Sequence, residues 1–97
     1  MSQNEPVTVR ILEREYRVMC APEQRRDLME SALLLDQQMR EIRDGGRISS
    51  MDKIAVMSAL NLAEEVIQLR QALQAREAMD ARLRKMAASL EASQPEE

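Results

Sequence analysis

Residues 50–94 read SMDKIAVMSALNLAEEVIQLRQALQAREAMDARLRKMAASLEASQ and contain neither proline nor glycine. The stretch is rich in Ala, Leu, Met, Glu, Gln and Arg, which favour helices, so it predicts one long helix. At about 1.5 Å per residue this helix would extend for roughly 65 Å. A chain of 97 residues cannot bury such a rod along its whole length. We therefore expect the helix to begin in a globular part and to leave it.

The apolar pattern of this helix changes along its length. Near the start, residues 54–67 are apolar on nearly all sides, which is typical of a core segment. Further along, apolar residues recur at the heptad spacing of a coiled coil and form a row along the helix that we call the seam. One longer step interrupts the seam and shifts it around the helix. The seam residues are Leu62, Val66, Leu69, Leu73, Met79, Leu83, Met86 and Leu90. We predict that they form an oligomer interface in a coiled coil.

A second, shorter helix is predicted before Gly45-Gly46, because a glycine pair commonly ends a helix. Its start is marked by Pro22, which suits a first helical turn. One apolar stripe recurs at helical spacing between residues 28 and 42. Leu33 and Leu34 lie off that stripe, so the helix is apolar on more than one side. We expect those two residues to contact a second subunit.

Two short alternating segments precede this helix. Residues 7–12 and 15–20 alternate apolar and polar side chains and are rich in β-branched residues, as half-buried strands are. Only Glu13-Arg14 separates them, which predicts a β-hairpin with its turn at that pair. A hairpin is marginal in water by itself, so its apolar face should cover a helix.

These elements define a fold class and a domain plan. We expect an α+β fold that is mostly helical, with an N-terminal hairpin, a short helix and a long helix extending into a coiled coil. The expected parts are a disordered N-terminus at 1–6, a globular head at 7–68, a coiled coil at 69–92 and a disordered acidic tail at 93–97. The chain contains only one aromatic residue and can form only a small hydrophobic core by itself. We therefore expect it to gain stability by forming oligomers.

Composition excludes several function classes. The chain has no histidine and one cysteine, which removes imidazole bases, histidine-paired nucleophiles and thiolate metal clusters. We therefore expect no catalytic, cofactor-binding or metal-binding residues and no small-molecule substrate. A net charge of −3 and a single aromatic residue argue against nucleic acid and anionic membranes as partners. No segment is apolar enough to span a membrane, and one cysteine suits a reducing cytoplasm.

The arginines of the first half allow two interpretations. Arg14 falls at the hairpin turn, and Arg43 and Arg47 lie around the connection between the helices. Such exposed, rigidly backed positions are common in recognition surfaces. The alternative is ordinary solubilising charge, since acidic residues of the same half slightly outnumber its basic ones.

The order of these segments resembles the ZapA family, bacterial proteins associated with the cell-division GTPase FtsZ. The resemblance is carried by VTVRILEREYRV at 7–18, CAPEQR at 20–25, Arg47-Ile48, and DKIAVMSALNL at 52–62. It covers roughly residues 6–70, and beyond them only helical and coiled-coil character is shared. At the position of Glu13 the family often has glycine.

The resemblance implies a dimeric head and tetramers formed through antiparallel coils. It implies a non-enzymatic cytoplasmic protein at the mid-cell division site, whose heads bind FtsZ filaments and bundle them. By position, the implied FtsZ contacts are Arg14, Arg43, Arg47 and Asp52. Two rival hypotheses remain, namely a coiled-coil adaptor with another partner and a ribbon-helix-helix DNA-binding protein.

Overall fold

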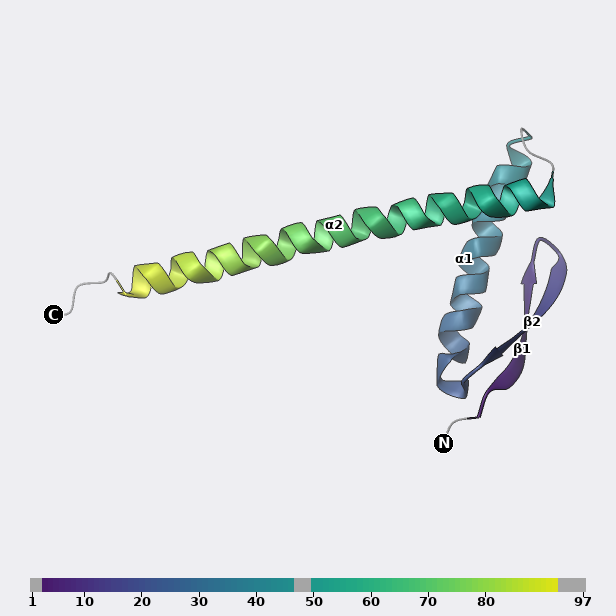
Figure 1. Cartoon of the computed structure of the whole chain (residues 1–97), viewed down its shortest axis with the longest axis horizontal. Helices are drawn as coiled ribbons and strands as arrows, with labels where there is room; N and C mark the ends of the chain where they lie inside the picture. Colours follow the sequence, from purple (N-terminus) through teal and green to yellow (C-terminus); the bar gives the residue numbers. More distant parts are fainter. Residues whose placement is uncertain (1–2, 47–49, 93–97) are drawn as a thin grey trace. The chain divides into compact units, whose positions relative to one another are not determined.

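The computed structural model of the chain describes residues 3–46 and 50–92. The elements in chain order are β1 (Glu5–Ile11), β2 (Arg14–Cys20), the 3-10 turn η1 (Pro22–Gln24), α1 (Arg25–Asp44) and α2 (Met51–Ala92). Figure 1 shows the two strands and the two α-helices. The expected fold class is confirmed: the described chain is mostly helical, with an N-terminal hairpin, a helix and then a long helix. None of its helices is long and apolar enough to cross a membrane.

The chain divides into two compact units, Met1–Leu62 and Ala63–Glu97. This division falls within α2, between Leu62 and Ala63, and the sequence predicts the end of the head at residue 68. The first unit holds the hairpin, α1 and the first three turns of α2. The second unit, as far as residue 92, is helix alone.

The hairpin is antiparallel, with Val7 opposite Val18 and Ile11 opposite Arg14. Its boundaries differ from the predicted ones. Glu5 and Pro6, which we assigned to a disordered N-terminus, lie in β1 because the ladder extends to the pair Glu5 and Cys20. At the other end of the hairpin, the turn consists of residues 12 and 13, whereas the sequence predicts it at residues 13 and 14. β1 therefore ends, and β2 begins, one residue earlier than predicted.

Two apolar clusters form the core of the first unit. One joins the inner face of the hairpin to α1 through Val7, Val9, Cys20 and Ala32. The other joins Leu12 to Met39 of α1 and Ile54 of α2. The α1 stripe predicted from the sequence supplies the α1 members of both clusters. They are Leu28, Ala32, Leu35, Met39 and Ile42.

Both ends of α1 have identifiable causes. At its start, Pro22 opens η1, and the Gln24 N–H donates to the Ala21 carbonyl at 2.9 Å. At its end, the Gly45 N–H donates to the Glu41 carbonyl at 3.1 Å, and Gly46 adopts φ +74°. A left-handed residue after the last turn suits glycine. The predicted role of the glycine pair is confirmed.

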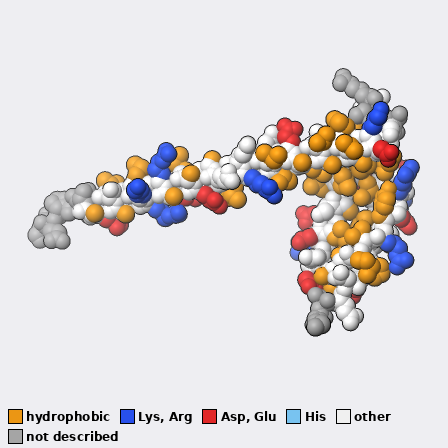
Figure 2. All heavy atoms as spheres, viewed as in Figure 1, with side chains coloured by type: hydrophobic (Ala, Val, Ile, Leu, Met, Phe, Trp, Pro, Cys, Tyr) orange, Lys and Arg blue, Asp and Glu red, His pale blue; other side chains and the backbone are white. Residues whose placement is uncertain are grey.

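Burial along α2 is confined to its first turns. Ile54 is 2% exposed and Ser58 is fully buried. In the second unit, every residue from 63 to 92 is exposed. Figure 2 shows apolar side chains spaced along this part of α2 among charged ones.

Candidate partner-binding surface

The hairpin turn has an unusual backbone. Leu12 and Glu13 adopt φ +47° and +69°, the left-handed pair of a type I′ turn. Glycine, asparagine and aspartate are the usual residues there, because a larger side chain in the left-handed region is strained. Neither residue of this turn belongs to that set, so contacts outside the turn must stabilise it.

Two contacts with the rest of the first unit hold the turn. The Leu12 side chain is 8% exposed and packs against Met39 and Ile54. The Leu12 N–H donates to Oδ1 of Asp36 on α1, with an N···O distance of 2.7 Å. An aspartate on the helix therefore fixes the tip of the hairpin against α1.

The same aspartate begins a charged network on the surface. Its Oδ2 accepts a hydrogen bond from Arg40 Nε at 2.8 Å. Glu13 Oε1 lies 3.6 Å from Nη1 of Arg40 and 3.6 Å from Nη1 of Arg43. Arg43 Nε also lies 3.5 Å from Asp44 Oδ1. The network thus joins the turn to the last two turns of α1, and we call these five residues the turn network.

Hydrogen bonding shifts two pKa values in the turn network. The Arg40 guanidinium and then the Leu12 N–H, as donors to the carboxylate, lower the pKa of Asp36 below its ordinary value. The pKa of Arg40 is raised by its hydrogen bond to Asp36. Asp36 and Arg40 are therefore a charged pair at neutral pH.

The structure places the sequence-predicted contact residues in different settings. Arg14 is the first residue of β2, directly after the turn, and it is exposed. Arg43 belongs to the turn network through Glu13. Asp52 lies in the first turn of α2 and is exposed, and it forms no ion pair within the described ranges. Arg47 lies outside the described residues. The structure therefore places Arg14 next to the turn and joins Arg43 to the turn through Glu13, whereas Asp52 forms no ion pair with the turn network among the described residues.

Asp36 and Arg40 are not among the contact residues predicted from the sequence. Their i, i+4 spacing on a helix is a signal of pairing that the sequence does contain. The hydrogen bond that the Leu12 N–H donates to Asp36 joins positions 24 apart in the chain, and no local pattern reveals it.

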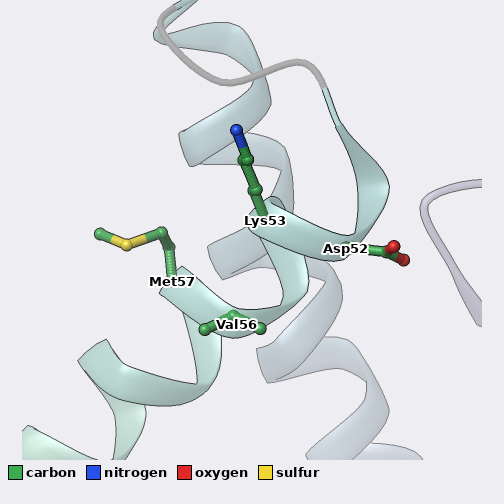
Figure 3. A pocket seen from close by; sticks show the side chains of 4 residues that line it. All are labelled: Asp52, Lys53, Val56 and Met57. Atoms are coloured by element: carbon green, nitrogen blue, oxygen red, sulfur yellow. The ribbon is translucent and has the colours of Figure 1, made fainter.

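A shallow hollow lies on the first turns of α2. Its volume is about 290 Å³, and it is lined by Asp52, Lys53, Val56 and Met57. Figure 3 shows that all four side chains come from one helix and that Asp52 and Met57 extend to opposite sides of it. Val56 is 59% exposed. The hollow is an open, partly apolar surface.

The residues expected at an oligomer interface are, apart from Leu62, exposed to solvent in the single chain. Leu33 is 70% and Leu34 is 48% exposed on α1. On α2, Leu62 is half-buried and the other seven seam residues are exposed.

Cys20 is a free cysteine that is buried in the core. Among residues 3–46 and 50–92, no group of three or more Cys, Asp or Glu side chains could hold a metal ion. The conspicuous surfaces are the turn network and the exposed apolar seam.

Comparison with known proteins identifies similar sequences and a similar structure. Residues 7–90 match the family described as cell division protein ZapA. A protein of that name from Pseudomonas aeruginosa PAO1 is 40% identical over 73 residues, 75% of this chain and 70% of that protein. A solved structure described as an unknown conserved bacterial protein from the same strain has a TM-score of 0.69 and 32% identity. That match covers 91% of this chain and 98% of the other.

Proposed function

This chain belongs to the ZapA family of cell division proteins, and from that premise we propose that it binds FtsZ filaments and cross-links them in the division ring. It acts without catalysis, in the cytoplasm at mid-cell. Its heads make the filament contact, and its α2 helices pair to hold two or more heads in one assembly, as dimers and as tetramers built from them.

The observation that carries this proposal is the exposed seam of the second unit. Leu69, Leu73 and Leu83 are 69%, 57% and 54% exposed in the single chain. Apolar residues in heptad steps on a fully exposed helix are buried when helices associate in a coiled coil. Roughly 30 residues of helix beyond Leu62 would supply a spacer of about 45 Å. A stiff spacer between heads is what filament cross-linking requires.

The filament contact is assigned to the charged surface around the hairpin turn. Arg14 and Arg43 lie on rigid elements at or beside the turn network. Together with Arg47 and Asp52, they are the proposed FtsZ-binding residues. Contacts between charged groups at a protein surface are weak and are screened by salt. Two weak heads in one assembly gain avidity on a repeating filament while each contact stays reversible.

The test is high-speed sedimentation of GTP-assembled FtsZ with and without this protein, at low and high salt. We expect the protein to pellet with filaments at low salt and to pellet less at high salt. Failure of the folded, oligomeric protein to pellet at either salt would contradict the proposal, and would leave an adaptor with another partner.

A further inference from the structure

Two arginines of α1 present their guanidinium groups to one carboxylate. Arg40 and Arg43 lie one helical turn apart, and each has its Nε beside a carboxylate of its own helix, Asp36 and Asp44. These contacts orient the guanidinium groups so that both Nη1 atoms lie 3.6 Å from Oε1 of Glu13. We call Arg40 and Arg43 the arginine clamp.

Glu13 holds the arginine clamp weakly. Both Nη1···Oε1 distances exceed ordinary hydrogen-bond length, and the Glu13 side chain is 64% exposed. Exposed ion pairs of this kind contribute little and are screened by salt. The turn does not depend on this side chain, because burial of Leu12 and its hydrogen bond to Asp36 hold the turn.

We infer that Glu13 is an internal competitor that occupies the arginine clamp until a carboxylate-rich segment of a partner protein displaces it. Paired guanidinium groups recognise carboxylates through charge-assisted hydrogen bonds, and the group that now faces the clamp is itself a carboxylate. The inference deepens the proposed function and rests on it in one respect, namely that the partner in the cell is a filament that presents such a segment.

The test measures binding of a fluorescein-labelled hexaglutamate peptide by fluorescence anisotropy at low salt. Glu13→Gln removes the competing charge and keeps the length of the side chain. We expect this variant to bind the peptide about three- to fivefold more tightly than the natural protein, the ratio that loss of an exposed ion pair allows. Adding Arg40→Gln to Glu13→Gln should abolish the gain.

Glu15→Gln is the matched control. Glu15 is exposed on β2, close to Glu13 in the chain, and forms no ion pair within the part of the chain that the structure describes. Glu15→Gln removes one negative charge, as Glu13→Gln does, but it leaves Glu13 beside the arginine clamp. The affinity for the peptide should therefore change less than about 1.5-fold. Equal tightening by both variants, or no tightening by Glu13→Gln, would overturn the inference. Circular dichroism of each variant checks the fold.

FtsZ sedimentation with the same variants separates this inference from the proposed function. Hexaglutamate affinities that follow the expected order, without any pelleting on FtsZ, would refute the filament partner and support the clamp. If the protein pellets with FtsZ but Glu13→Gln leaves its affinity for hexaglutamate unchanged, the filament partner is supported and the competitor role of Glu13 is refuted.

Discussion

At the scale of single residues, the hairpin turn is a local strain balanced by tertiary contacts. Leu12 and Glu13 hold left-handed backbone angles without glycine or asparagine. Each such residue costs about 1–2 kcal/mol. Burial of Leu12 and the 2.7 Å hydrogen bond from its N–H to Asp36 offset that cost. The strand register, and with it the position of Arg14, therefore depends on α1.

Glu13→Gly should stabilise the protein at high salt. Glycine relieves the strain at φ +69°, and this gain is reduced by the extra freedom glycine gives the unfolded chain, about 0.4–1 kcal/mol. We expect a net increase of about 0.5–1 kcal/mol in the free energy of unfolding, measured by urea denaturation at fixed protein concentration. At low salt the loss of the Arg40 and Arg43 ion pairs should reduce the gain.

Glu13→Gln is the control for that substitution. It removes the same ion pairs but keeps the strained backbone, so it should leave stability unchanged or slightly lower. If Glu13→Gly is no more stable than Glu13→Gln at high salt, relief of backbone strain at the turn does not raise the free energy of unfolding, which would contradict the prediction.

Asp36 should make stability depend on pH. Its folded-state pKa lies below the ordinary value, so its charge contributes stability above about pH 4 and loses it as pH falls through the lowered folded pKa. We expect Asp36→Asn to be less stable than the natural protein at pH 6.5, and the difference to shrink at pH 3. Urea midpoints at both pH values measure this. A difference that does not change with pH would contradict the assigned pairing with Arg40.

At the scale of elements, sequence periodicity reveals most of the fold. The helical stripe, the glycine stop and the alternating strands all mark elements that the structure contains, because each pattern reflects burial of one face. The turn was misplaced by one residue, since Leu12 and Glu13 carry no turn signal of their own. The extension of β1 to Glu5 was missed because strand pairing, rather than side-chain pattern, orders its polar first residue.

The candidate surface was predictable only in part. Position in the chain predicted Arg14 at the hairpin turn and Arg43 at the connection between the helices, and the ion pair of Arg43 with Glu13 at the turn was not predicted. The roles of Asp36 and Arg40 depend on α1 packing against the hairpin tip, which a single sequence does not specify.

The start of α2 should be sensitive to substitution. Ile54 is 2% exposed and joins the hairpin tip to α1 through Leu12 and Met39. Ile54→Ala should lower the free energy of unfolding by about 2–5 kcal/mol, through lost burial and a cavity. The neighbouring Val56→Ala is the control, because Val56 is 59% exposed. Equal effects in denaturant titrations would contradict the assigned core.

At the scale of the whole molecule, we propose a head that binds filaments and a helix that pairs with other copies of the chain. Substitution of Leu73 and Leu83 by serine should leave the head folded, because both residues lie in the second unit and are exposed in the single chain. It should weaken association, since the seam would lose apolar area. Sedimentation velocity should then show smaller assemblies, whereas Gln74→Ser, off the seam, should change nothing.

The most direct test of the central claim is differential sedimentation of FtsZ polymers with the natural protein and with the Leu73→Ser, Leu83→Ser double variant. A low-speed spin collects bundles, and a high-speed spin collects single filaments with whatever they bind. We predict bundles with the natural protein, and filament binding with few bundles for the double variant. Bundling by the double variant equal to that of the natural protein would contradict cross-linking through paired helices.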